Sequence, residues 1–249
     1  MKQLFVCLVI AIALLSSCKK ELKSISLSET EIFMHYEETH QLNVSYSPSD
    51  VDVPPVFSWS SDDSNIAEID QNGNVEAIKV GETQVTVQTE NGKFQASCNV
   101  IIEPISNLYE QPITEWGKSF NYVLENEKRT YIVETESAIL YEGENSKVEN
   151  VMYMFDYSGL NSVIVILKET EAVLDEASVY LEERFDLLTV LDSGIAYKVN
   201  NDVVAVLGYD NGLGLFVLYM ENTLTKSSNL MSNQLRDLKN TYKILKKIN

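Results

Sequence analysis

The chain has 249 residues, a formal net charge of −18 at pH 7 and a composition that is 45% hydrophobic. This length suits one large domain or two modest ones, and the apolar fraction is that of a globular protein. The acidic balance argues against nucleic acid as a partner, because binding to phosphates needs facing lysines and arginines.

The first residues have the organisation of an export signal. Lys2 is followed by an apolar run from Leu4 to Leu15, which is shorter than the ~20 residues that a membrane-spanning helix needs. The run ends in Leu15-Ser16-Ser17-Cys18. This tetrad resembles the bacterial lipobox, in which the leader is cut before the cysteine and the sulfur receives a diacylglyceryl group. The resemblance implies a signal peptide over residues 1–17 and a lipid-anchored linker over residues 18–23.

A lipid on Cys18 would determine where the protein is located. Two or more acyl chains anchor a protein stably, whereas one chain binds reversibly. We therefore expect a lipid-anchored protein of the bacterial cell envelope, in the outer membrane, facing the periplasm or the cell surface. Lys19-Lys20-Glu21 is similar to the charged surface-export tags of Bacteroidetes lipoproteins, although it has fewer acids.

Residues 24–104 consist of short alternating strands separated by turn residues. Asn72-Gly73 and Asn91-Gly92 each lie between apolar alternations, which is a strong hairpin signal because both residue types tolerate positive φ. About seven strands in such a length predict a two-sheet sandwich. Cys98 alternates in phase with Val100. It has no expected disulfide partner, since Cys7 leaves with the leader, so we predict a buried thiol.

Residues 24–103 resemble the bacterial Ig-like domain of group 2. The matching phrases, in order, are Trp59-Ser60-Ser61-Asp62, Ile66-Ala67-Glu68-Ile69-Asp70, Asn72-Gly73-Asn74-Val75-Glu76-Ala77 and Gly81-Glu82-Thr83. The chain departs from the family at Tyr36-Glu37-Glu38-Thr39, where a glycine usually precedes Glu-Thr. The resemblance implies an extracytoplasmic spacer or adhesive module without catalytic residues.

The hydrophobic period changes in residues 105–225. A first helix is predicted after Thr114 as N-cap, with one apolar face made of Trp116, Phe120, Val123 and Leu124. A second is predicted after Thr170, with its apolar face made of Leu174, Ala177, Leu181 and Phe185. Strand-like runs follow each helix, at 131–133, 138–141, 151–157 and 163–167, then at 195–199, 203–207 and 213–219.

This restart predicts an α+β domain of two tandem helix-plus-antiparallel-sheet units that share a core. The whole chain is therefore expected to be mainly β. The arrangement is similar to the tandem helix–sheet domains that follow Ig-like modules in lipoproteins of gut Bacteroidetes. It is also similar to small secreted inhibitors built from repeated helix–sheet units. Likeness at fold level is weak evidence for function.

Residues 226–249 are predicted to form a basic amphipathic C-terminal helix. Its apolar residues repeat with 4-3-4-3 spacing and are Met231, Leu235, Leu238, Tyr242 and Leu245. Three interpretations are open for this stripe. It packs on its own domain with the lysines solvated, it fits a groove of a partner, or it contacts anionic lipid headgroups.

No catalytic, cofactor or metal site is predicted. His35 and His40 are five residues apart, and odd spacing along a strand places side chains on opposite faces. Gly212-Leu213-Gly214 precedes a strand, whereas a phosphate-binding loop opens a helix. A glycan-processing hydrolase with two distant carboxylates stays an alternative, but no pair stands out among 37 acids.

The sequence thus predicts a non-catalytic envelope lipoprotein, in which an Ig-like spacer presents a binding or adhesion domain to a protein or glycan ligand. The partners expected are the membrane, through the N-terminal lipid, and an envelope protein or glycan; the oligomeric state is open. Aromatic rings stack on sugars and anchor interfaces. The candidate ligand-binding aromatics are Trp116, Tyr122, Tyr153, Tyr157, Tyr209 and Tyr219. The alternative is an inhibitor or assembly factor that docks another envelope protein through the helix–sheet domain.

Overall fold

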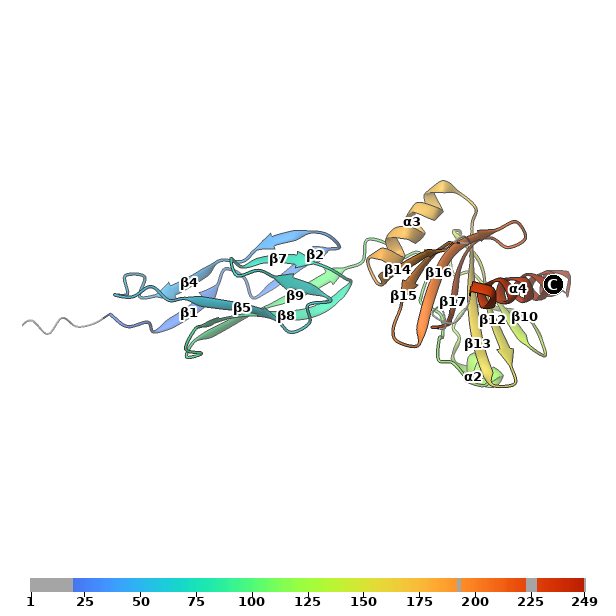
Figure 1. Ribbon diagram of the computed structural model, residues 1–249, viewed down its shortest axis with the longest axis horizontal. Helices are drawn as coiled ribbons and strands as arrows, with labels where there is room; N and C mark the ends of the chain where they lie inside the picture. The colour runs from blue at the N-terminus through green and yellow to red at the C-terminus, as the bar shows by residue number, and fades with distance from the viewer. Residues whose placement is uncertain (1–19, 192–193, 223–227, 249) are drawn as a thin grey trace, which may run out of the picture. The chain divides into compact units, whose positions relative to one another are not determined.

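The computed structural model describes residues 20–191, 194–222 and 228–248 (Figure 1). The export signal and the lipid site at Cys18 lie outside the described residues and stay predictions. Far more of the described residues lie in strands than in helices, which confirms a mainly β protein. The chain divides into two compact units between Glu103 and Pro104.

The N-terminal unit consists of short strands around one hydrophobic core. Its strands are β1 (Ser24–Leu27), β2 (Glu31–His35), β3 (Thr39–Gln41), β4 (Val44–Ser47), β5 (Phe57–Ser61), β6 (Ala67–Ile69), β7 (Asn74–Ala77), β8 (Gly81–Thr89) and β9 (Gln95–Glu103). They form sheets in the orders β2-β9-β8-β5, β3-β7-β6 and β1-β4. Leu42, Trp59 and Cys98 are buried in the core. Burial raises the pKa of the Cys98 thiol to about 11, and the predicted buried thiol is confirmed.

Both predicted Asn-Gly turns lie between paired antiparallel strands. Asn72-Gly73 joins β6 to β7, and Asn91-Gly92 lies between β8 and β9. Gly73 has φ +84°, and a Cβ at this position would lie 2.7 Å from both the Leu42 carbonyl oxygen and the Trp59 ring. A side chain there would clash, so the turn requires glycine. Glu37 has φ +65° without being glycine.

The C-terminal unit is built on one antiparallel sheet of eight strands (Figure 1). The strands are β10 (Tyr131–Thr135), β11 (Ala138–Glu142), β12 (Val148–Asp156), β13 (Gly159–Leu167), β14 (Asp186–Leu191), β15 (Gly194–Lys198), β16 (Val203–Asp210) and β17 (Gly214–Glu221). Their order is β10-β11-β12-β13-β17-β16-β15-β14. The strands β10–β13 therefore lie in one half of the sheet and β14–β17 in the other, and β13 pairs with β17 at the centre.

The sheet has a hydrophobic core on each face. On one face, α2 (Phe120–Asn126) and α3 (Glu171–Glu182) pack against a core that includes Tyr153, Val165 and Val217. On the other face, α4 (Ser228–Ile248) buries Leu238, Tyr242 and Leu245 against the sheet. The apolar stripe of the C-terminal helix therefore packs on its own domain through these three residues. The side chain of Met231 lies outside the described residues.

The first helix begins later than the sequence predicts. Its N-cap is Ser119, whose side chain accepts a hydrogen bond from the Tyr122 backbone N–H, so the prediction of Thr114 as N-cap is wrong. Gly117 has φ +77°, a left-handed conformation that interrupts a right-handed helix. Trp116 therefore lies before the helix and not on its face.

The second helix begins where the sequence predicts, with one difference in the face that it buries. The Thr170 side chain accepts a hydrogen bond from the Val173 backbone N–H at 3.3 Å, which confirms this N-cap. Val173, Ala177 and Leu181 are buried, whereas Leu174 is exposed. The prediction that Leu174 belongs to the buried face is wrong because the helix is rotated so that Val173 packs inward.

Candidate ligand-binding cleft

Two of the six candidate aromatics belong to the core. Tyr153 and Tyr219 are fully buried. The hydroxyl of Tyr219 shares a hydrogen bond of 2.9 Å with that of Tyr109, and the Tyr153 hydroxyl donates to the Glu127 carboxylate. Burial raises the pKa of both tyrosines well above the usual value. A ring without exposed surface cannot stack on a ligand, so the prediction for these two residues is wrong.

Three further candidates, Trp116, Tyr122 and Tyr157, lie apart from Tyr209 and do not line the same cleft. The indole Nε1 of the half-buried Trp116 donates to the Asp202 carbonyl at 3.1 Å. The hydroxyl of the half-buried Tyr122 donates to the Glu115 carboxylate. Tyr157 is fully exposed in the turn between β12 and β13. The structure therefore does not gather the six rings into one patch.

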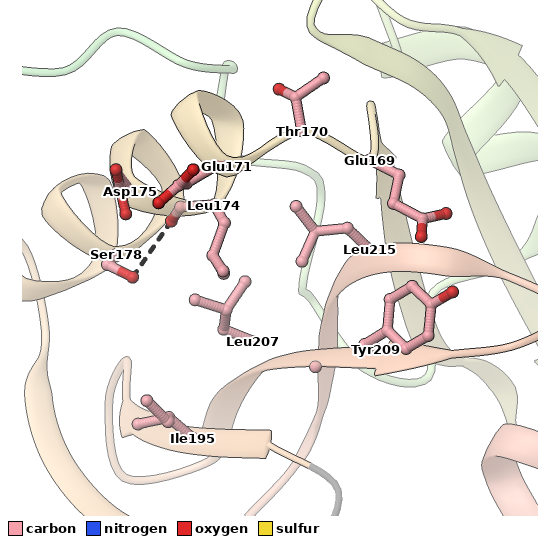
Figure 2. A pocket seen from close by; sticks show the side chains of 11 residues that line it. Glu169, Thr170, Glu171, Leu174, Asp175, Ser178, Ile195, Leu207, Tyr209 and Leu215 are labelled. Atoms are coloured by element: carbon pink, nitrogen blue, oxygen red, sulfur yellow. Dashed lines mark hydrogen bonds between the residues drawn. The ribbon is translucent and has the colours of Figure 1, made fainter.

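The remaining candidate, Tyr209, lines a cleft of about 590 Å³ between α3 and the strands β15, β16 and β17 (Figure 2). A cleft of this size is in the range of small-molecule and side-chain pockets. Its apolar surface comes from Leu174 on α3 and from Ile195, Leu207 and Leu215 on the sheet. In Figure 2, Leu174 extends from the helix toward Leu207.

The position of α3 over the sheet forms the cleft. Val173 and Ala177 anchor one side of the helix in the core. The end of the helix is held by the fully buried Glu183, whose carboxylate accepts hydrogen bonds from the Ile105 and Ser106 backbone N–H groups at 2.7 and 3.1 Å. Helix α3 is therefore held in place by the side that carries Val173 and Ala177 and by its C-terminal end at Glu183. Leu174 lies on a different side of the helix and lines the cleft.

The lining of the cleft is acidic as well as apolar. It contains three carboxylates, those of Glu169, Glu171 and Asp175, and no basic side chain. A hydrogen bond with Glu169 raises the pKa of Tyr209. A negative lining around an apolar floor favours a ligand that has a cationic group next to an apolar one.

Sequence reasoning found only Tyr209 among the residues of this cleft. A usable signal was present in the second helix, where Glu171, Leu174 and Asp175 follow one another at helical spacing. Residues three and four apart share a helix face, so this set predicts an acidic face that contains one leucine.

The described part of the chain contains neither a candidate metal site nor a membrane-spanning helix. Within residues 20–191, 194–222 and 228–248, no group of three or more His, Cys, Asp or Glu side chains is arranged to hold a metal ion. No helix in the described part of the chain is both long and apolar enough to cross a membrane. The Nε2 atom of His40 lies 2.6 Å from the Glu29 carboxylate, and His35 lies 3.7 Å from Glu38.

Comparison with known proteins identifies the N-terminal unit. Residues 21–100 match the family model of the bacterial Ig-like domain (group 2), in agreement with the resemblance found in the sequence. Residues 21–100 are thus a bacterial Ig-like domain, and the match covers the N-terminal unit alone. The function of the C-terminal unit has to be argued from its own structure.

Curated relatives match over a short stretch. An uncharacterised protein of Clostridium acetobutylicum is 35% identical over 85 residues, which is 34% of this chain and 9% of that protein. A polysaccharide lyase 8 family protein of Enterococcus faecalis is 30% identical over 100 residues, which is 39% of this chain and 7% of the lyase. The chain thus spans less than a tenth of the length of either relative.

Solved structures give only a distant likeness. An intimin mutant from EHEC O157:H7 has a TM-score of 0.27 and 13% identity over 49% of this chain and 87% of that one. Domains 5–6 of the S-layer protein SbsC have a TM-score of 0.29 and 13% identity over 81% of this chain and 85% of that one.

Proposed function

We propose that the protein is a non-catalytic lipoprotein of the bacterial cell envelope, in which the Ig-like domain is a spacer and residues 104–249 bind a ligand in the cleft beside α3. The observation that carries this proposal is the cleft itself. It combines an apolar floor with three carboxylates on a helix and the loop before it. This surface is suited to recognition of a cationic, apolar group.

A protein ligand fits the cleft better than a glycan. Tyr209 is the one candidate aromatic in its lining, whereas sugar recognition favours broad aromatic faces. The leucines and the isoleucine of the floor suit aliphatic side chains, and the carboxylates suit lysine or arginine. The ligand that we propose is therefore a segment of another envelope protein.

Site-specific photo-cross-linking in living cells tests this function. p-Benzoylphenylalanine replaces Leu174 in the full chain, and the control carries it at Leu124, a helix residue of similar exposure (42% and 37%). We expect an adduct from position 174 and a much weaker one from position 124. A protease-sensitive mass on the adduct identifies a protein ligand, and a protease-resistant mass identifies a glycan. Equal labelling at both positions, or none at either, contradicts the proposal.

Anchoring by lipid on Cys18 and location in the outer membrane are part of the proposal. The full chain, expressed in a lipoprotein-processing host, should partition into the detergent phase of Triton X-114. The Cys18→Ser variant cannot be processed as a lipoprotein. It should therefore either keep its leader or, if another peptidase removes the leader, stay in the aqueous phase. Radiolabelled palmitate should enter the wild-type protein alone. An unlabelled wild-type protein would refute the anchor and leave the cleft proposal to the cross-linking result.

A second candidate function is an inhibitor or assembly factor that docks another envelope protein. The observation that favours it is an exposed apolar strand at the edge of the sheet, β14. Docking through a strand edge and binding in the cleft are compatible, because Val190 of β14 pairs with Ile195, which lines the cleft.

A further inference from the structure

The strand β14 is a sheet edge of unusual composition. It is the last strand in the sheet order, and among the described residues its paired neighbour is β15. Its residues from Asp186 to Val190 are all exposed. Three of these are large and apolar, namely Leu187, Leu188 and Val190. An exposed apolar edge favours pairing with another chain, and proteins usually protect such edges with charges or a covering segment.

The opposite edge of the same sheet is protected. There β10 carries Glu134 among its five residues. Ile132 and Val133 of this strand are partly buried against the core on the α4 side. Each edge strand carries one acid, Glu134 or Asp186, so the two edges differ in burial rather than in charge. Large aliphatic side chains are exposed on β14, whereas on β10 they are partly buried.

A β-bulge places Leu187 and Val190 of β14 on the same face of the sheet. The register shifts between Leu187 and Thr189, so that Leu187 pairs with Tyr197 while Val190 pairs with Ile195. Tyr197 and Ile195 are two residues apart and share a face, and so do the residues opposite them. Without the bulge, Leu187 and Val190 would point to opposite faces. With it, both lie on the same face of the sheet as Ile195, which lines the cleft.

We propose that an extended, basic segment of a partner protein pairs with the outer edge of β14 and adds a ninth strand to the sheet. Main-chain hydrogen bonds would supply affinity, and apolar side chains of the segment would cover Leu187 and Val190. This inference rests on the proposed function, since it describes how the ligand of the cleft is held.

The charges nearby define the chemistry of the segment. The cleft on this side of the sheet carries Glu169, Glu171 and Asp175 and no basic side chain. A second copy of this chain would bring the same acids to the same edge and carries a formal net charge of −18. Like charges oppose that pairing. The occupant is therefore a different, basic chain.

Fluorescence anisotropy with a defined peptide tests the inference on the full chain. The probe is a fluorescein-labelled decapeptide of alternating lysine and valine. Val190→Lys places a cation on the edge, and Val53→Lys is the matched control, because both valines are highly exposed (72% and 80%). We expect Val53→Lys to bind as the wild type does, and Val190→Lys to bind about tenfold or more weakly. The same peptide with glutamate in place of lysine should not bind.

Two N-methylated peptides test strand pairing itself. In a paired strand, alternate backbone N–H groups point to the neighbour. One peptide is methylated at the backbone nitrogen of every valine, and the other at the backbone nitrogen of every lysine. One of these two peptides should therefore lose binding, and the other should keep it. Binding that survives both, or is lost equally in both, overturns strand addition, and so does a wild-type protein that fails to bind the parent peptide.

A cleft variant separates the two proposals. Leu174→Lys introduces a cation into the cleft without changing β14. If Leu174→Lys weakens binding while Val190→Lys and both methylated series leave it unchanged, the peptide binds in the cleft and strand addition is wrong. If none of these changes alters affinity, the peptide binds neither surface, and both proposals fail for this ligand class.

Discussion

A single substitution, Glu37→Gly, should stabilise the Ig-like domain. Glu37 follows β2 and has φ +65°, in the left-handed region that costs an L-residue about 1–2 kcal/mol. Glycine removes this cost but loses about 0.5–1 kcal/mol through the greater freedom of the unfolded chain. The net gain expected is therefore about 0–1.5 kcal/mol, and its central value of about 0.75 kcal/mol corresponds to roughly 3–6 °C in the melting temperature of a domain of this size.

The chain has two tryptophans, which allow a clean assay. Trp59 lies in the core of the Ig-like domain. If all variants also carry Trp116→Phe, the remaining tryptophan fluorescence comes from Trp59 and reports unfolding of the Ig-like domain. Urea unfolding should show a midpoint about 0.5 M higher for Glu37→Gly than for the parent. Glu37→Ala is the control, since it removes the same charge but keeps a Cβ. Equal stabilisation by alanine and glycine would show that charge, and not backbone conformation, is responsible.

Three further predictions concern buried polar groups. In Tyr242→Phe, the buried hydroxyl that donates to Asn150 at 2.9 Å is lost, and urea unfolding should show a loss of about 1–3 kcal/mol; an unchanged midpoint would contradict this. Burial raises the pKa of Tyr141 and of Tyr180 to about 12, whereas unfolded tyrosine ionises near pH 10. The unfolded chain then binds fewer protons from pH 10 to 12, so stability should fall as pH rises through this window. Circular dichroism during urea unfolding at pH 9 and 11 measures this, and equal midpoints would refute it. Cys98, with a pKa of about 11 and no exposed surface, should react with iodoacetamide at pH 8 only after unfolding, and rapid labelling of the native protein would show that the thiol is accessible.

Local sequence patterns were sufficient to predict the segments whose contacts are strictly periodic or lie within a few residues. Val85 and Val87 alternate with polar residues, and β8 buries both in the sandwich core. The Asn72-Gly73 turn could be predicted because few residue types tolerate its backbone conformation. Thr170 could be predicted as a cap because its side chain satisfies a backbone N–H within its own turn.

The strand β14 had no counterpart among the predicted strands. Its sequence, Asp186-Leu187-Leu188-Thr189-Val190-Leu191, shows no polar and apolar alternation, because five of its six residues are exposed and a bulge breaks the period. Periodicity reports burial on one face, and an edge strand without a buried face does not produce it. The surface on which the further inference rests was therefore not visible in the sequence pattern.

The sequence did not predict the cleft, and Tyr209 is the only one of its lining residues that was predicted to bind a ligand. Leu174 was predicted to lie on the buried face because of its helical spacing to Ala177 and Leu181, but the neighbouring Val173 fits such a stripe equally well. Packing of Val173 and Ala177 against the sheet decides between them, and that packing depends on strands far away in the sequence. Tyr153 and Tyr219 show the same limit, since neighbouring strands determine whether a tyrosine is a core residue or an exposed one.

Hydrogen exchange of the protein in its own envelope tests the central claim most directly. Outer-membrane vesicles that carry the anchored protein would be compared with the purified full chain by mass spectrometry. We predict slower exchange in the vesicles over Glu171–Glu182 and Gly194–Lys198, the segments that contribute Leu174 and Ile195 to the cleft. Exchange that is identical in both samples, or slowed only within residues 21–100, would contradict a binding site beside α3.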